Sequence, residues 1–283
     1  MTRVSIALAL LLAAGVARAD DVDEPADKPA EAPPAKPPTK LRRIYVRAGA
    51  VFIQPLSSSK PLELANLSGP ASLALSNGPI AGSGATIGSA WTPGLIIGYV
   101  LPKWHDRFAI ETILGLPFTV KFQATGTLAN QSLAPTVLGL PTGVMPLGSE
   151  LGEAQAVPPV VTMTYALRPG PVKPYVGAGV AMLFASGAKI TNPMLTQLSH
   201  PEFDIDPAPG LVVQAGVDAR IWQRVYARLD VKFIGLMQAN ATIHHLEVAT
   251  PALPLFGAAD VDTAKMSVWV NPVIVQLGVG ADF

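Results

Sequence analysis

Residues 265–283 read KMSVWVNPVIVQLGVGADF, and this stretch decides the fold. Counting back in twos from Phe283, one parity is apolar: Ala281, Val279, Leu277, Val275 and Val273. The other parity is small or polar: Asp282, Gly280, Gly278 and Gln276. Alternation with a period of two predicts a β-strand with one apolar face. Since no covering segment follows this strand in the sequence, we expect lipid to cover that face.

Seven earlier segments show the same kind of alternation. The clearest is Val225–Gln238, in which Arg228, Asp230 and Lys232 share one parity while Leu229 and Val231 lie on the other. The remaining six predicted strands are Ile44–Gln54, Thr92–Tyr99, Arg107–Leu116, Val157–Leu167, Pro174–Ala185 and Ala208–Ile221. With Lys265–Phe283, the sequence therefore predicts eight strands.

The connections between these strands alternate in length. Short turns around residues 101–106, 168–171 and 222–224 alternate with four long connections: Pro55–Ala90, Pro117–Gln155, Ser186–Pro207 and Asn240–Asp262. A soluble sandwich is not expected to segregate its loops in this way. The pattern is typical of an all-β, up-and-down, antiparallel transmembrane β-barrel of eight strands, with four long extracellular loops and short periplasmic turns.

The composition and the N-terminus indicate an exported membrane protein. The 283 residues are 49% hydrophobic and only 14% charged. The apolar run Val4–Val16 follows Arg3 and precedes Ala17-Arg18-Ala19, so residues 1–19 are predicted to be a secretory signal peptide rather than a membrane span. An exported, apolar chain with no later spanning helix can enter a membrane as a closed barrel, which pairs all its backbone groups between strands. We therefore expect a multi-pass protein of the outer membrane of a Gram-negative bacterium.

The segment after the signal differs in composition from the rest. Residues 20–42 are rich in Pro and Ala with interspersed charges, and Val22 is the one large apolar residue before Leu41. Such a segment cannot bury enough apolar area to offset the entropy of ordering. It is predicted to be a disordered periplasmic tether, acting as a plain spacer or as a docking segment, and residues 43–283 are predicted to form the barrel.

The charged residues on the strands fall on the inward parity. The predicted polar network of the lumen comprises Arg47, Glu111, Gln214, Asp218, Arg220, Arg228, Asp230 and Lys232. Because its charges nearly balance, we expect ion pairs that hold the barrel shut. A selective ion path is the alternative, although eight strands enclose room only for side chains or one small ligand.

Two further groups of residues are assigned by position. Phe283, Val279 and Leu277 on the last strand are predicted to be the signal read by the barrel assembly machinery. Tyr99, Tyr165 and Trp269 lie near strand ends, where they fit either an interfacial aromatic girdle or ordinary core packing.

Several kinds of chemistry find no support in the sequence. There is no cysteine, and the adjacent His244 and His245 would point to opposite faces of a strand, so no metal site is expected. No nucleophile elbow, catalytic triad or phosphate loop is present, and we expect neither an enzyme nor a cofactor. Balanced charge, with 20 basic and 20 acidic residues, argues against nucleic acid.

Segments spread over most of the chain resemble the outer-membrane protein W (OmpW) family. They include VRAGAVFIQP (46–55), GYVLPKWHDRFAIETILGLPF (98–118), KPYVGAGV (173–180), ARLDVKFI (227–234) and VNPVIVQLGVGADF (270–283). The resemblance implies an eight-stranded barrel with a hydrophobic upper lumen and a polar, closed floor. It also implies passage of small hydrophobic molecules with sideways release into the membrane. The tether, the longer apolar loops and the Ala-Asp-Phe ending depart from the family pattern.

Two functions remain open from the sequence. The first is a channel for passive uptake of small hydrophobic molecules, which enter an apolar mouth and leave laterally, with outer-membrane lipid and these solutes as partners. The alternative is a structural or adhesive barrel that binds a partner through its loops or its tether. The sequence leaves the oligomeric state open.

Overall fold

The computed structural model describes residues 43–69, 71–102, 104–252 and 258–283. The predicted signal peptide (1–19) and tether (20–42) lie outside the described residues. Within the described part, no helix is long and apolar enough to span a membrane, since α1 (Ala71–Ala74) and α2 (Thr127–Asn130) have four residues each.

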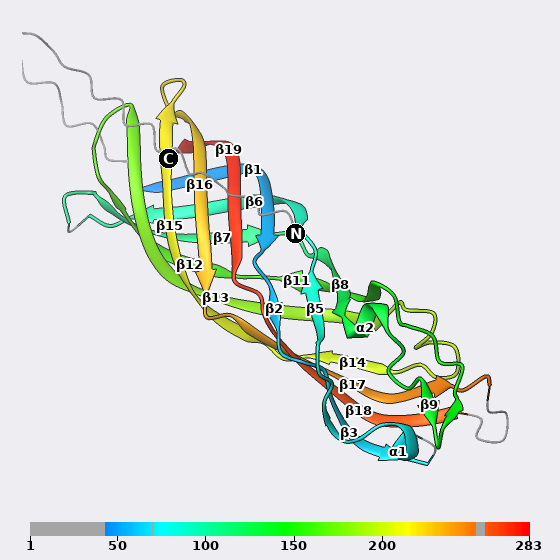
Figure 1. Ribbon diagram of the computed structural model, residues 1–283. Coiled ribbons are helices and arrows are strands. Elements are labelled where there is room, and N and C mark those ends of the chain that lie inside the picture. The colour runs from blue at the N-terminus through cyan, green and yellow to red at the C-terminus, as the bar shows by residue number, and fades with distance from the viewer. Residues whose placement is uncertain (1–42, 70, 103, 253–257) are drawn as a thin grey trace, which may run out of the picture. The chain divides into compact units, whose positions relative to one another are not determined.

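Eight antiparallel strands close into a barrel, as the sequence predicted (Figure 1). They are β1 (Ile44–Pro55), β6 (Ala90–Val100), β7 (Phe108–Gly115), β12 (Val160–Ala166), β13 (Val172–Ile190), β15 (Ala208–Arg220), β16 (Val225–Gly235) and β19 (Pro272–Asp282). Each strand pairs with the next in this order, and pairing of β19 with β1 closes the ring. Strand β1 begins and β19 ends at the same rim, which we call the terminal end; the opposite rim is the loop end.

Side chains alternate across the barrel wall as expected. On β16, Leu229 and Val231 are 45% and 39% exposed, whereas Asp230 and Lys232 are 0% and 1% exposed. This arrangement, with apolar side chains outside and charged ones inside, reverses that of a water-soluble protein. It suits a wall that faces lipid.

The long connections were predicted as loops, but much of them is sheet. Strands β8 (Phe118–Gly126), β11 (Glu150–Val157) and β5 (Ser83–Ile87) extend the barrel sheet beyond the end of β12. A second sheet contains β17 (Gln238–Ala249), β18 (Ala258–Trp269), β14 (Glu202–Ile205), β3 (Glu63–Ser68) and β4 (Gly78–Pro79), with β2 (Ser58–Ser59) paired to β18. Figure 1 shows β17 and β18 running on from the barrel as one long hairpin. The predicted loop Asn240–Asp262 is therefore mostly strand.

Three predicted strands are each divided into two. The segment Val225–Gln238 bends at Leu236 (φ 60°), between β16 and β17. The segment Lys265–Phe283 bends at Asn271 (φ 32°), between β18 and β19. At these bends β17 and β18 separate from the barrel strands. Val157–Leu167 is interrupted by Pro158 and Pro159, which lack the N–H group needed for the ladder.

The barrel wall divides at the loop end of β13. This strand pairs with β15 as far as Leu183, which lies opposite Ala208. Beyond that pair, β13 continues alongside β11, whereas the chain preceding β15 forms β14 and pairs with β17. We call this division, just beyond the pair Leu183 and Ala208, the fork.

Candidate functional site

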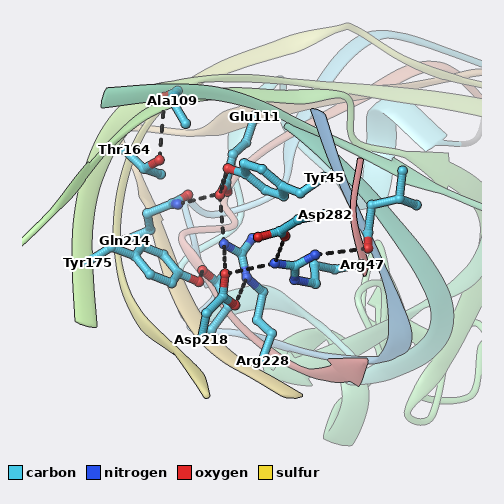
Figure 2. Close-up of polar contacts among 12 residues, drawn as sticks. Tyr45, Arg47, Ala109, Glu111, Thr164, Tyr175, Gln214, Asp218, Arg228 and Asp282 are labelled. Carbon is cyan, nitrogen blue, oxygen red and sulfur yellow. Dashed lines mark hydrogen bonds and ion pairs between the residues drawn. The ribbon is translucent and has the colours of Figure 1, made fainter. Parts of the chain in front are cut away.

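Ion pairs fill the barrel interior toward the terminal end, and Arg228 lies at their centre (Figure 2). Its Nε donates to Asp218 Oδ1 at 2.7 Å, and its Nη2 donates to Glu111 Oε1 at 2.9 Å. Tyr45 Oη donates to the same Glu111 oxygen at 2.5 Å, and Gln214 Nε2 donates to Oε2 at 3.2 Å. Two carboxylates thus share one guanidinium, in the geometry that makes charge-assisted hydrogen bonds strong.

Arg47 and Lys232 supply the other two buried cations. Arg47 Nη2 lies 2.7 Å from Asp282 and 3.3 Å from Asp218. Lys232 Nζ pairs with Asp230, which also accepts a hydrogen bond from Tyr175 Oη at 2.5 Å. Three buried cations therefore face three buried anions, so their charges cancel. We call this set, with its hydrogen-bonded partners, the floor: Arg47, Glu111, Asp218, Arg228, Asp230, Lys232, Tyr45, Tyr175 and Gln214.

Two tyrosine rings of the floor lie over glycines on neighbouring strands. Gly98 is directly opposite Tyr45, and a Cβ at Gly98 would lie 2.0 Å from Tyr45 Cζ. Gly216 is opposite Tyr175, and a Cβ there would lie 2.3 Å from Tyr175 Oη. The missing side chains make room for the rings, and Arg228 stacks over Tyr175 with 4.6 Å between its Cζ and the ring centroid.

The structure brings seven of the eight predicted network residues together inside the barrel. Arg220 is different, because it lies exposed at the terminal end of β15 and donates from Nε to Tyr226 Oη. The prediction missed Tyr45, Tyr175 and Asp282. It also missed Gln276, which is 0% exposed and whose side-chain amide has no protein hydrogen-bond partner among the described residues.

The three residues predicted as an assembly signal point outward. Leu277, Val279 and Phe283 are between 55% and 67% exposed, on the lipid-facing side of β19. Their recognition by the assembly machinery stays a prediction.

Above the floor, toward the loop end, the interior becomes apolar. Buried side chains there include Val51, Ile96, Ile113, Val160, Val212 and Ile234. They lead to a cavity of about 60 Å³, which we call the throat. Its lining includes Ile53, Phe118, Leu183 and Met237.

We call the part of the chain beyond the barrel the extension; it comprises β5, β8 and β11 and the second sheet. Its two sheets enclose a second cavity of about 130 Å³ beyond the throat, which we call the chamber. Its walls are almost entirely aliphatic and include Leu62, Leu64, Leu128, Leu195, Leu246 and Val261. The throat and the chamber adjoin, since Ile87, Phe122, Ile205 and Ala239 line both. An aliphatic cavity of similar size, about 150 Å³, in another protein stays dry and binds benzene.

Two threonines are the polar side chains in the chamber wall, and both are engaged. Thr142 Oγ1 donates to the Ala134 carbonyl and accepts from the Val144 amide, and Thr250 also has a partner. No group of three or more His, Cys, Asp or Glu suited to a metal occurs in the described parts of the chain. The chamber can therefore hold an apolar molecule but offers it almost no hydrogen bonds.

A groove on the outer face lies beside the throat, next to the fork. This open groove is lined by Pro159, Met182 and Leu236, whose neighbours in sequence, Pro158, Leu183 and Met237, line the throat. The outer groove and the inner cavity are therefore opposite sides of the same strands.

Comparison with known proteins agrees with this architecture. The family model described as the OmpW family matches residues 44–283. Over 187 residues the chain is 24% identical to the dibenzothiophene metabolism operon protein PahQ of Pseudomonas aeruginosa, covering 66% of this chain and 68% of that protein. The same figures apply to DoxH of Pseudomonas sp. strain C18, which carries the same operon description.

Solved structures share the fold. The outer membrane protein OprG of Pseudomonas aeruginosa superposes with a TM-score of 0.63 at 18% identity, covering 86% of this chain and 96% of OprG. The outer membrane protein AlkL, solved in lipid bilayers, gives a TM-score of 0.50 at 19% identity, with 90% and 96% covered. The chain therefore belongs to the OmpW family and is a multi-pass β-barrel of the Gram-negative outer membrane.

Proposed function

We propose that this protein is a passive, non-enzymatic conduit for small uncharged apolar molecules. A solute enters the chamber from outside the cell, moves into the throat and leaves sideways into the outer leaflet of the membrane. The observation that carries the proposal is the succession of an apolar chamber, an apolar throat and an ion-paired floor.

The floor blocks the straight route. Six charged residues in it are at most 7% exposed and are paired with one another. An apolar solute crossing this layer would have to separate buried ion pairs, and leaving one such charge without its partner costs about 3–5 kcal/mol. Passage toward the periplasm along the barrel axis is therefore unfavourable.

The fork supplies the lateral route. Near Leu183 the wall loses the continuous ladder that joins β13 to β15, and the outer groove lies against the throat there. A solute leaving at this height enters hydrocarbon without crossing a polar layer. The description of PahQ and DoxH as dibenzothiophene metabolism operon proteins supports an apolar ring compound as the solute.

A reversible cross-link at the fork tests the route. Leu183 and Ala208 are directly opposite in the antiparallel ladder, where Cα atoms lie about 4.5–5.5 Å apart, within reach of a disulfide. In Leu183→Cys/Ala208→Cys, oxidation should slow naphthalene uptake into proteoliposomes several-fold, and a reductant should restore it. The described chain has no cysteine that could mispair.

The matched control places a cross-link where the wall is continuous. Val213 and Phe233 are opposite on β15 and β16, and both face outward, away from the throat. Val213→Cys/Phe233→Cys should transport equally well oxidised and reduced. Equal uptake by the oxidised and reduced fork variant would rule out this exit, and an uptake rate equal to that of empty vesicles would rule out transport altogether.

Deletion of the tether distinguishes the conduit from the adhesive or structural alternative. Deletion of residues 20–42 should leave naphthalene uptake unchanged if the protein is a conduit. Two results together would favour the alternative. The deletion would weaken the cell envelope, and the full chain would take up naphthalene no faster than empty vesicles.

A further inference from the structure

A small hairpin lies over the outer end of the chamber. Strands β9 (Thr136–Val137) and β10 (Leu140–Pro141) pair with each other and form a sheet of their own, at the end of the extension far from the barrel (Figure 1). Val137 is 3% exposed and faces the chamber, as do Thr142 and Val144. We call residues 136–145 the crown.

Three apolar side chains of the crown are exposed. Leu138, Leu140 and Met145 are 76%, 57% and 66% exposed, and Met145 also borders the chamber. Single exposed apolar residues are common on protein surfaces, but these three fall within eight residues of the sequence, and concentrated exposed apolar area is typical of contact sites.

No charge dilutes this patch in the sequence around it. Between Lys121 and Glu150 there are 28 consecutive residues without Asp, Glu, Lys or Arg. Protein partners are usually held by about one hydrogen bond per 100–200 Å² and by a polar rim. An uncharged segment with exposed leucines lacks a polar rim and fits an apolar phase better than a protein.

The turn of the crown carries a residue that is unusual for its backbone conformation. Leu138 and Gly139 have φ values of 50° and 81°, as in the two-residue turns that normally carry Asn-Gly. A branched side chain is unfavourable in this left-handed conformation. Leucine thus occupies a position where Asn would relieve strain and expose less apolar surface to water.

The crown contacts the segment Pro251-Ala252. The Ala252 amide donates to the Thr142 carbonyl at 3.1 Å, and Gly143 (φ 77°) packs so closely on Pro251 that a Cβ would lie 3.1 Å from its ring. The exposed leucines lie close in sequence to Val137, Thr142 and Val144, which line the chamber.

We propose that the crown binds the surface of a hydrocarbon droplet, so that the protein docks on an undissolved oil phase. Leu138, Leu140 and Met145 insert into the droplet surface, as apolar side chains do at other water–hydrocarbon boundaries. The chamber then lies next to the phase that holds the solute. This capture step is distinct from transport of dissolved molecules.

Flotation with hexadecane droplets tests the proposal. The full chain in lipid nanodiscs should float with the droplets, and Leu138→Asn/Leu140→Thr should lower the adsorption constant about tenfold or more. The control Ile221→Asn/Trp222→Thr removes two exposed apolar side chains from the opposite, periplasmic turn and should change adsorption less than twofold. Equal adsorption of the crown variant and the wild type would overturn the proposal, as would preferential adsorption to phosphatidylcholine vesicles.

Folding and transport are checked separately. Because Asn accepts the left-handed turn more readily than Leu, Leu138→Asn alone should keep the thermal unfolding midpoint and still reduce adsorption. Uptake of naphthalene from droplets should fall in the crown variant, whereas uptake of dissolved naphthalene should not. Absence of dissolved uptake in the wild type would refute the conduit but leave the adsorption result to decide the crown.

Discussion

The floor and the chamber are enclosed by different parts of the sheet structure, and the walls around them have opposite polarity. In the barrel, Asp230 and Lys232 point inward and Leu229 and Val231 outward. In the extension, Ile243 and Leu246 of β17 point into the chamber, and Asn240 faces out. The difference shows that the medium outside the wall changes from lipid to water. The bends at Leu236 and Asn271 lie between these two regions of the chain.

The largest expected effect concerns the floor. Arg228→Met should lower the free energy of unfolding by about 3–5 kcal/mol, because Glu111 and Asp218 would remain buried without their shared cation. Urea unfolding in lipid vesicles, followed by tryptophan fluorescence, measures the loss.

Arg220→Met is the matched control for this change. It makes the same substitution at the exposed end of β15, where a hydrogen bond of an exposed charge contributes about 0–1 kcal/mol. If both variants lost less than about 1 kcal/mol, the floor would not be the tightly coupled network described above.

An intermediate effect concerns the chamber, and it is measured with two ligands of nearly equal shape. Benzothiophene has no hydrogen-bond donor, whereas indole must bury an N–H group that the aliphatic wall cannot satisfy. An unmet donor costs about 1–3 kcal/mol, so indole should bind roughly tenfold to a hundredfold more weakly. Displacement of a fluorescent apolar probe from the protein in nanodiscs gives both affinities. Affinities within threefold would mean that the chamber holds a polar partner or water.

The smallest effect concerns the top of the floor. Gln276→Met replaces a buried amide that lacks a protein partner by an apolar side chain of similar length, and it should change stability by less than about 1 kcal/mol, toward greater stability. Gln214→Met is the contrasting variant, because it removes a donor to Glu111 and should destabilise. Unfolding of both variants in urea provides the comparison. A loss of more than about 2 kcal/mol in Gln276→Met would show that this amide is hydrogen-bonded.

The barrel could be predicted from the sequence because lipid imposes a strict period of two. Arg228, Asp230 and Lys232 can avoid hydrocarbon only by facing inward, and this requirement fixed the parity of β16. The prediction missed Tyr45 and Tyr175, since tyrosine occurs both inside barrels and in the aromatic girdle at the membrane interface. A glycine lies opposite each tyrosine on the neighbouring strand, and this pairing could have indicated that the rings face inward. It could not be used, because the sequence alone does not give the register between strands.

The extension could not be predicted in the same way. In β17 the residues that line the chamber include Ala239, Ala241 and Ile243, whereas Thr242 and His244 occupy the alternate positions. The difference in polarity between the two faces is smaller than in β16, where charged residues alternate with Leu and Val. Leucine at Leu236 is unusual in this conformation and gave no turn signal. Asn271 followed by Pro272 is a turn signal, which the prediction of one continuous strand overlooked. The Asn240–Asp262 hairpin therefore looked like a loop.

The pairing of each floor tyrosine with a glycine sets where a through-going pore could be engineered. If Tyr45 and Tyr175 were both shortened to alanine, the facing strands would have nothing to contribute, because Gly98 and Gly216 bear no side chain that could swing into the space. Water would then gain a path alongside Arg228. The two aromatic rings fill the space over Gly98 and Gly216, so they are the side chains to shorten first.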